Sequence, residues 1–302
     1  MEKYPITENV FKYMRKNDVL FHKTLDYITG HFGEEYFVFC EELLRVLKQK
    51  CATDNNFTKS LNAVIKFSRE FLLLQTRLNM EGTYVHSSFK EVNNSVYQSE
   101  KMNEYYLDGL FLTQILWPNH YKIISFFLKQ QDITDPSSLL LDVACGAGTY
   151  TYHTARAFDY EHLEVIDISP HSVAYTRDIL RCSSLDDEKV NLEVSDIYEF
   201  ENREKFDFIV CSELLEHVED PAHLLNKLES ILKDGGRIFL TTAIYAAEID
   251  HICLFNNVGE VRKLIMKNFQ MISELILPTS LEEFKPDMDK VPINYACVLR
   301  KR

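Results

Sequence analysis

The sequence predicts an α/β protein in which a mostly parallel sheet, with helices on both faces, follows an all-helical N-terminal region. Two observations carry this prediction. Residues 8–130 place apolar side chains at helical spacing and contain almost no glycine. From Leu139 onward, short β-rich runs alternate with amphipathic stretches, which is typical of βαβ units. We therefore expect a helical cap over residues 1–130 and a sheet domain over residues 131–302.

The helical cap should contain roughly five or six helices, because apolar residues recur with a period near 3.6 in stretches such as Glu35–Lys50 and Leu61–Leu78. Glycine, proline or polar residues interrupt this pattern at four places, where we expect the helices to end. These breaks are Gly30–Gly33, Cys51–Phe57, Glu81–Ser88 and Trp117–Pro118. A polar, proline-containing connection over Asp132–Ser138 then leads into the sheet.

The first strand should run directly into a glycine-rich turn within Leu139–Thr149. Leu139–Leu141 fits a strand that is buried on both faces, and Gly146 and Gly148 allow the backbone to approach a ligand closely. Tyr150–Phe158 can form the helix that follows. Ligands of open α/β sheets bind at this edge, so the turn predicts a site for an adenosine cofactor.

The cofactor need not be a dinucleotide. A dinucleotide fingerprint has a third glycine at the position where this sequence has Thr151. Asp142 lies at the strand end, where its carboxylate would repel a pyrophosphate and attract a cationic group. Alternatively, Asp142 could cap the following helix. S-adenosylmethionine carries an ammonium and a sulfonium but no phosphate, and it therefore suits this turn.

The motif D-x-x-C-G-x-G at Asp142–Gly148 resembles the first motif of the class I S-adenosylmethionine-dependent methyltransferases. Four later segments are similar to that family in order and spacing, namely Val165–Pro170, Val194–Ile197, Phe206–Pro221 and Leu232–Thr242. The resemblance covers roughly residues 121–302 and implies a Rossmann-like seven-stranded sheet. Val258–Asn268 is expected to be a helix, and Met271–Leu277 and Ile293–Leu299 a final antiparallel pair of strands.

The resemblance also implies which residues surround the cofactor. Asp167 lies 19 residues after Gly148, a separation at which an acid reaches ribose hydroxyls, although it could be only a surface acid. Asp196 is the candidate for the adenine, unless Ser195–Ile197 only initiates a turn. The complete predicted cofactor set is Asp142, Ala144, Gly146, Gly148, Asp167, Ile168, Asp196, Ile197, Ser212 and Tyr106.

The main candidate for chemistry is Glu213-x-x-Glu216-His217, after the expected fourth strand. Its spacing places three groups on one side of a helical turn, where together with His251 they could hold a divalent metal ion. The arrangement is similar to that of ubiquinone-pathway O-methyltransferases and small-RNA 2′-O-methyltransferases. The simpler alternative is a helix start whose dipole stabilises Glu213 and Glu216. In either case, His217, His251 and Glu216 are the predicted catalytic residues, with the two histidines as candidate general bases.

The segment Tyr105–His120 is dense in aromatic and polar side chains. In related methyltransferases the region before the first strand folds over the cofactor as a lid. We expect Tyr105 or Tyr106 to face the cofactor, because aromatic faces attract cations. Tyr105, Gln114 and His120 are predicted to line the acceptor pocket. The alternative for each of them is packing of an interface helix on the sheet.

Composition limits the partners. The net charge is −13, from 46 acidic and 33 basic side chains, which disfavours binding to a nucleic-acid backbone. The sequence shows neither a signal-peptide pattern nor an apolar run long enough to span a bilayer, so no membrane association is expected. Seven cysteines without a C-x-x-C pair suit reduced thiols. We expect a cytoplasmic protein that could form a homodimer.

Together these observations predict transfer of a methyl group from S-adenosylmethionine to a small-molecule acceptor in specialised metabolism. Oxygen is the favoured acceptor atom, with nitrogen and carbon as alternatives. Four other hypotheses stay open: metal-assisted C-methylation of a 2-oxo acid, methylation of an acyl group on a carrier protein, a catalytically silent S-adenosylmethionine-binding protein and, last, an RNA 2′-O-methyltransferase.

Overall fold

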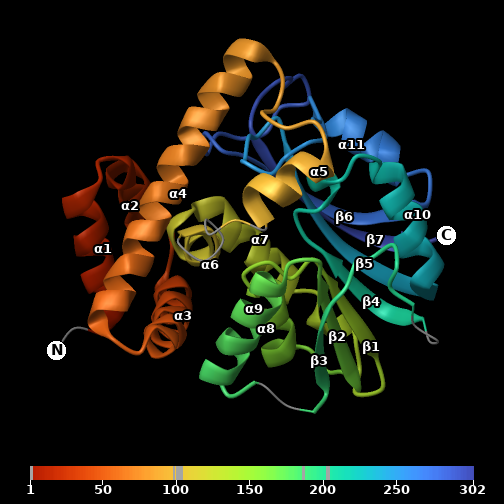
Figure 1. Cartoon of the computed structure of the whole chain (residues 1–302), viewed down its shortest axis with the longest axis horizontal. Coiled ribbons are helices and arrows are strands. Elements are labelled where there is room, and N and C mark those ends of the chain that lie inside the picture. The colour runs from red at the N-terminus through yellow and green to blue at the C-terminus, as the bar shows by residue number, and fades with distance from the viewer. Residues whose placement is uncertain (1–2, 98, 100–104, 186–187, 202–204) are drawn as a thin grey trace.

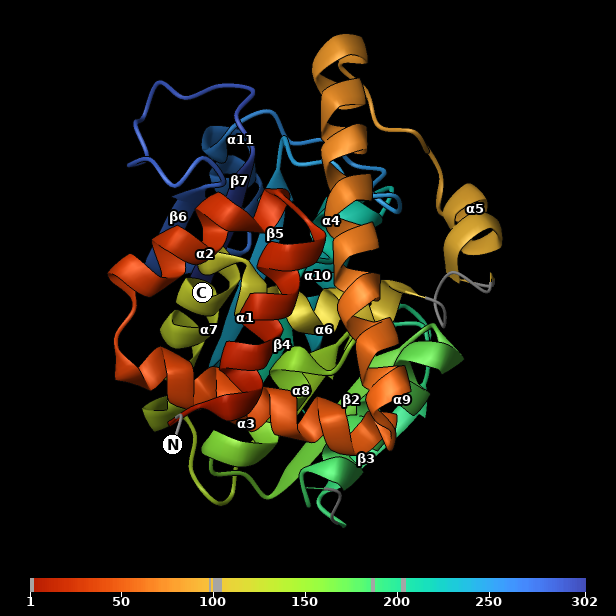
Figure 2. The same ribbon diagram turned by 90° about the vertical axis from the view of Figure 1, so that its left-hand side faces the viewer.

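The computed structural model describes residues 3–97, 99, 105–185, 188–201 and 205–302. Figure 1 shows the N-terminal helices α1–α4 gathered to one side of the sheet. In Figure 2, turned by 90°, the same helices lie in front of the strands. Within the described ranges, no helix has the length and apolarity needed to cross a bilayer. All seven cysteines are free thiols.

Seven α-helices precede the sheet in the described part of the chain. They are α1 (Pro5–Asn17), α2 (Leu20–His31), α3 (Glu34–Cys51), α4 (Asp54–Glu81), α5 (Phe89–Val92), α6 (Leu107–Leu116) and α7 (Pro118–Leu128). A π-helical turn, η1 (Asn93–Tyr97), follows α5, and a 3-10 turn, η3 (Gln131–Ile133), follows α7. Each of the four predicted breaks includes a boundary between two of these helices. The break between α1 and α2 is an additional one that the sequence pattern does not predict.

Seven strands form one sheet in the order β3-β2-β1-β4-β5-β7-β6. They are β1 (Leu139–Val143), β2 (His162–Asp167), β3 (Val190–Val194), β4 (Phe206–Cys211), β5 (Leu232–Ile244), β6 (Phe269–Pro278) and β7 (Ile293–Lys301). Neighbours among β1–β5 are parallel, whereas β7 is antiparallel to both β5 and β6. The predicted Rossmann-like sheet is therefore confirmed.

Four further helices connect the strands: α8 (Thr149–Ala157), α9 (Pro170–Cys182), α10 (Pro221–Ile231) and α11 (Val258–Ile265). Three of them begin at a polar side chain that accepts a hydrogen bond from a backbone N–H of the first turn. These N-caps are Ser169, Asp220 and Asn257. Proline at the first helical position pre-sets the backbone of α9 and α10. These features determine where each strand-to-helix loop ends.

Alternate residues of the central strands build a core on each face of the sheet. Leu140 belongs to a cluster with Phe127 of α7, whereas Leu141 belongs to a cluster with Leu225 of α10. A third core unites α1–α4 and α6 with Ile179 of α9. Thus α7 covers the sheet although the predicted boundary near residue 130 places it in the helical cap. That boundary stays a prediction.

Candidate active site

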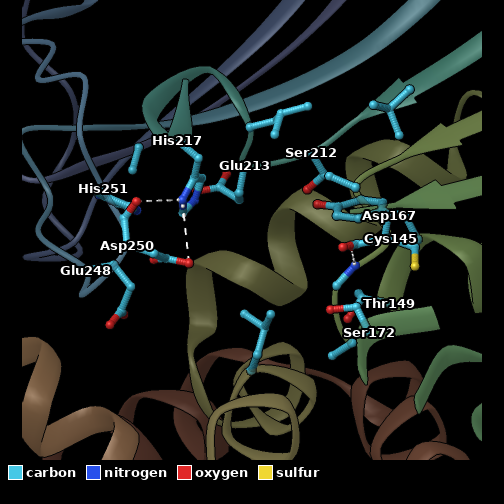
Figure 3. A pocket seen from close by; sticks show the side chains of 18 of the residues that line it. Cys145, Thr149, Asp167, Ser172, Ser212, Glu213, His217, Glu248, Asp250 and His251 are labelled. Atoms are coloured by element: carbon cyan, nitrogen blue, oxygen red, sulfur yellow. Dashed lines mark hydrogen bonds and ion pairs between the residues drawn. The ribbon is translucent and has the colours of Figure 1, made fainter. Parts of the chain in front are cut away.

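A cavity of about 500 Å³ lies at the carboxyl edge of the parallel strands. The strand order reverses between β1 and β4, which is where open α/β sheets bind ligands. The loops after β1, β2, β3, β4 and β5 all contribute to the lining, as do α4 and the region from α6 to α7. Figure 3 shows the labelled side chains in two groups, one around Asp167 and the other around His217 and Asp250. The volume suits small molecules.

The turn after β1 has a left-handed backbone at three positions, with φ of 62° at Ala144, 53° at Gly146 and 71° at Gly148. Ala144 and Gly146 line the cavity. Gly148 does not, because it faces α9: a Cβ there would lie 2.8 Å from Oγ1 of Thr176. Gly148 is therefore required for close packing of the turn against α9, and Gly146 for its path beside the ligand site.

Two buried aspartates fix this turn. Thr151 Oγ1 donates a 2.5 Å hydrogen bond to Asp142, whose pKa burial raises to about 7. Asp167 accepts from the backbone N–H groups of Gly146 at 2.9 Å and Ser169 at 2.8 Å, although burial still raises its pKa to about 6. Helix α8 begins after Gly148 with no side-chain cap, so Asp142 binds a side chain of the first turn rather than capping the backbone.

Nine of the ten predicted cofactor residues line this one cavity, and Gly148 is the exception. The Oδ1 atom of Asp196 accepts from the N–H of Tyr198 at 2.9 Å, and Ser212 Oγ lies 3.0 Å from Thr241 Oγ1. Three carboxylates thus face the cavity on this side, and the described part of the lining contains no lysine or arginine. This charge fits a cofactor that carries an ammonium and a sulfonium, and it does not fit a pyrophosphate.

The loop after β4 forms only a short 3-10 turn, η4 (Leu215–His217), and α10 starts later, at Pro221. The proposed helix start at Glu213 is therefore wrong. Glu213 instead has a φ of 46°, because its N–H bonds to the carbonyl of Thr241 at 3.0 Å and thereby pins the loop to β5. Glu213 and His217 line the cavity.

Glu216 lies behind these residues and has no exposed surface. Its carboxylate accepts from Thr242 Oγ1 at 2.6 Å and from the N–H of Ala243 at 3.0 Å. Burial, together with the neighbouring Glu213, raises the pKa of Glu216 well above its usual range. The structure therefore places Glu216 as a link between the β4 loop and the end of β5, away from the cavity lining.

The imidazole rings of His217 and His251 are 4.7 Å apart and nearly perpendicular. The Nδ1 atom of His251 lies 2.8 Å from the carbonyl oxygen of Ala246, and Nδ1 of His217 lies 3.1 Å from that of Asp250. Because a carbonyl only accepts, each Nδ1 carries the proton in the neutral ring and each Nε2 retains a lone pair. Burial lowers the pKa of His251 to about 3, so this ring is neutral at pH 7.

Three of the four predicted metal ligands lie together. Glu216, His217 and His251 each offer one ligand atom, and these atoms lie within 4.8 Å of one another. Glu213 is not part of this group. Two ligands bonded to one ion at about 2.2 Å lie at most about 4.4 Å apart, so the observed limit of 4.8 Å is close to the spacing that an ion requires. The hydrogen bonds from Nδ1 to carbonyls are those that commonly orient metal-binding histidines.

Asp250 is a central residue of the site that the sequence analysis missed. Its Oδ2 atom accepts from the hydroxyls of Tyr106 at 2.7 Å and Tyr97 at 3.1 Å, and it lies 3.5 Å from Nδ1 of His217. Burial alone would raise its pKa, but His217, His251 and the Tyr106 hydroxyl outweigh burial and lower it. The only available signal was the acid-rich segment Glu248–His251, in the loop that follows β5.

Only two of the three residues predicted for the acceptor pocket line the cavity. Gln114 and His120 line the cavity, whereas Tyr105 lies outside its lining and donates to Glu70 at 2.5 Å. The Gln114 amide is already occupied, since its Nε2 donates to a backbone carbonyl and its Oε1 lies 3.0 Å from His153. Burial lowers the pKa of His120 to about 4, which keeps this imidazole neutral.

Helix α4 holds the loop after β5 in place. The Gln75 side chain donates to the carbonyl of Tyr245 at 3.1 Å and accepts from the N–H of Ala247 at 2.9 Å. The Tyr84 hydroxyl donates to the carbonyl of Ala246 at 2.9 Å. The helical cap thereby positions the loop that carries Asp250 and His251.

Comparison with known proteins agrees with this geometry. Residues 135–285, half of the chain, match a family model described as a methyltransferase domain. Nodulation protein S of Sinorhizobium fredii is 32% identical over 130 residues, which is 42% of this chain and 56% of that protein. A ubiquinone biosynthesis O-methyltransferase of Hydrogenovibrio crunogenus is 30% identical over 170 residues, which is 52% of this chain and 63% of the relative. The chain spans about half the length of the curated relatives it matches.

Two solved structures share the fold. The N-methyltransferase NodS from Bradyrhizobium japonicum WM9, in complex with S-adenosyl-L-homocysteine, aligns with a TM-score of 0.50 at 16% identity, covering 72% of this chain and 99% of that one. The [4+2]-cyclase SpnF also gives 0.50 at 16% identity, covering 61% and 82%. The family model, the strand order and the cavity at the topological switch point agree, and the chain belongs to the class I S-adenosylmethionine-dependent methyltransferases.

Proposed function

We propose that this protein transfers a methyl group from S-adenosylmethionine to a small-molecule acceptor. The observation that carries the proposal is Asp167, whose carboxylate is held against the glycine turn by the N–H of Gly146 at the strand-order reversal. A similar protein, the NodS methyltransferase, has been solved with S-adenosyl-L-homocysteine, the demethylated form of this cofactor. We infer the same cofactor for this chain.

The residues that would hold the cofactor follow from their chemistry. Asp167 would accept hydrogen bonds from ribose hydroxyls, and Ile168 and Ile197 would contact the adenine beside Asp196. Asp142 and the turn at Ala144–Gly146 would face the cationic end of the cofactor. When bound, the cofactor supplies a methyl group on an already activated sulfonium, so the protein mainly has to align the acceptor and remove its proton.

His217 is the best-placed base for that proton. It lines the cavity, and its Nδ1 is committed to the carbonyl of Asp250, which leaves the Nε2 lone pair as the acceptor. The carboxylate of Asp250, 3.5 Å from Nδ1, would stabilise the imidazolium once the proton has arrived. His251 lies against the same ring and is a neutral neighbour.

Calorimetric titration with S-adenosyl-L-homocysteine tests the proposal, followed by transfer of a radiolabelled methyl group to a panel of small molecules. We expect saturable binding of one cofactor per chain and label transfer to at least one acceptor. Absence of binding would overturn the proposal. Binding without transfer to any acceptor would favour the catalytically silent alternative.

A metal-assisted reaction is a second candidate, and the proximity of Glu216, His217 and His251 favours it. A divalent ion there would polarise an acceptor oxygen or an enolisable carbonyl, as C-methylation of a 2-oxo acid would require. The test is to strip the protein with a chelator and to restore Mg²⁺, Mn²⁺ or Zn²⁺ while following turnover. Full activity after complete stripping would rule the metal out.

The partners are also proposals. A carrier protein could deliver an acyl acceptor to the cavity, and the helical cap could support a homodimer, which analytical ultracentrifugation would reveal. The sequence alone favours oxygen as the acceptor atom, but the charges of the cavity bear directly on that choice.

A further inference from the structure

The cavity is strongly acidic. Eight carboxylates line it, whereas the described residues contribute no lysine or arginine to the lining. Three of the eight are the aspartates of the cofactor side. The remaining five are Glu213, Glu219, Asp220, Glu248 and Asp250, and all of them come from the loops after β4 and β5. Burial raises the pKa of Glu213 and, together with Asp250, raises the pKa of Glu248 well above its usual value, so a cation bound beside these carboxyl groups would favour their ionised form.

Some of these acids have structural roles. Asp220 caps α10, and Glu219 accepts from the N–H of Phe89 at 3.0 Å. Two others are left with unused acceptor capacity. Among the described residues, the Glu248 side chain accepts one hydrogen bond, from the adjacent N–H of Ile249 at 3.0 Å.

Asp250 is the more telling case. Asp250 is only 2% exposed, and its buried Oδ1 atom has no hydrogen-bond partner among the described residues. An unpaired buried carboxylate oxygen destabilises the folded protein, because burial removes its water without supplying a donor. Such an atom in a cavity wall indicates a site that a ligand donor completes.

The side of the cavity that faces the N-terminal helices is aromatic rather than acidic. Phe67 and Phe71 of α4 meet Trp117 at ring-centroid distances of 5.8 Å and 5.2 Å, and Phe67 meets Tyr106 at 5.6 Å. All four residues line the cavity. Aromatic faces bind apolar groups and attract cations. A ligand for this half of the cavity therefore combines an apolar body with a positive charge.

We propose that the methyl acceptor is an amine, whose ammonium group binds beside Glu248 and Asp250 while its apolar body lies against the aromatic side chains of α4 and Trp117. Figure 3 shows Glu248 and Asp250 on the same side of the cavity, across from Asp167. This inference rests on the proposed function and specifies its substrate class. Acceptors that carry a carboxylate or phosphate would be repelled. Neutral alcohols would leave both acids without a counter-charge.

A proton leaves the acceptor before the methyl group arrives. The ammonium first gives one proton to Nε2 of His217, which restores the nitrogen lone pair. That lone pair forms the new N–C bond while the C–S bond breaks and its electron pair stays on sulfur. The positive charge of the sulfonium thus reappears on the methylated ammonium, beside the same two carboxylates.

Calorimetry on the full chain saturated with S-adenosyl-L-homocysteine tests the proposal. The probes are 2-phenylethylamine and longer arylalkylamines, each compared with the matching alcohol and carboxylate. We expect at least one amine to bind ten times more tightly than its alcohol, and the carboxylates to show no binding. Glu248→Gln should weaken amine binding at least tenfold and leave alcohol binding unchanged. Glu161→Gln, at an exposed acid remote from the cavity, is the control.

The outcomes separate the two proposals. If S-adenosyl-L-homocysteine itself does not bind, the proposed function fails. If it binds but the alcohols or carboxylates bind as tightly as the amines, or if no amine binds, the amine inference is wrong. Unchanged amine affinity in Glu248→Gln would also overturn it, provided that circular dichroism shows a folded variant.

Discussion

The phenol of Tyr106 donates a 2.7 Å hydrogen bond to Oδ2 of Asp250, which ties the chain just before α6 to the loop after β5. The sequence predicts Tyr106 as a cofactor residue, and it does line the cavity. Its hydroxyl, however, is used to hold Asp250. Tyr106 therefore supports the side of the cavity on which we propose that the acceptor binds.

Replacement of Tyr106 by Phe should separate these roles. Loss of a hydrogen bond to a charged group costs about 1.5–3 kcal/mol, so we expect a fall of about 1.5 kcal/mol in the free energy of unfolding. The affinity for S-adenosyl-L-homocysteine should change less than about twofold, because the hydroxyl is engaged elsewhere. Calorimetry and urea unfolding measure the two effects. Tyr105→Phe, which loses a hydrogen bond to Glu70 outside the cavity, is the matched control for cofactor affinity. A tenfold loss of cofactor affinity in Tyr106→Phe would restore the lid interpretation.

Asp167→Asn should weaken cofactor binding. The amide keeps the shape of the side chain but has a single acceptor oxygen, so it loses the N–H of Gly146 or that of Ser169, together with any ribose hydroxyl that binds at the same position. We expect the dissociation constant of S-adenosyl-L-homocysteine to rise at least tenfold, or about 1.4 kcal/mol. Asp159→Asn, at an exposed acid, should leave it unchanged. Equal affinities in the two variants would contradict the assignment of Asp167.

Gln75→Leu should loosen the loop after β5. It leaves the carbonyl of Tyr245 and the N–H of Ala247 without their partner, and each buried unpaired group costs roughly 1–3 kcal/mol. We expect the free energy of unfolding to fall by about 2–4 kcal/mol, and methyl transfer to fall more than cofactor affinity. Gln75→Glu keeps the acceptor but not the donor, so its loss should be intermediate. Identical losses in both variants would argue for a simple packing effect.

His153 should make the protein sensitive to acid. Burial, reinforced by Arg156, lowers its pKa to about 3, against an ordinary value of 6.5. Between these values the unfolded chain holds a proton that the folded chain does not, so the stabilisation is complete above pH 6.5 and is lost as the pH falls. Between pH 7.5 and 5 the loss is about 2 kcal/mol for this residue.

The variant His153→Gln isolates that contribution. Its free energy of unfolding should fall about 2 kcal/mol less than that of the unmodified protein between pH 7.5 and 5, measured by urea denaturation. The control is His31→Gln, at an exposed histidine. If both variants give the same pH slope as the unmodified protein, His153 is not the group responsible.

The features that can be predicted from the sequence are those determined by residues close together in the chain. The glycine turn is visible because left-handed backbone requires special residues, and Asp167 is visible because strand and helix lengths fix its distance from that turn. The break between α1 and α2 is not visible. It is stabilised by Asp18, which accepts from the N–H of Leu20 and pairs with the distant Arg69 at 2.6 Å.

The acceptor side was harder to predict for the same reason. Asp250 becomes a central residue only because Tyr97 and Tyr106, more than 140 residues earlier, reach it through the fold. Gln75 is an unremarkable polar residue of a helix until α4 packs beside the loop after β5. Conversely, the expected α-helix at Glu213 failed because hydrogen bonds to Thr241 hold that residue in a left-handed conformation.

The hydrogen bonds of Gln75 to the loop after β5 show that the two ends of the cavity are built by different parts of the chain. The predicted cofactor residues come almost entirely from strand ends, whereas the surroundings of Asp250 and His251 are assembled jointly by the loop after β5 and the first third of the sequence. If the acceptor binds beside Asp250 as we propose, changes in the N-terminal helices should alter which molecule is accepted without disturbing the proposed cofactor site. The helical cap is the part of this protein through which a lineage could acquire new substrates.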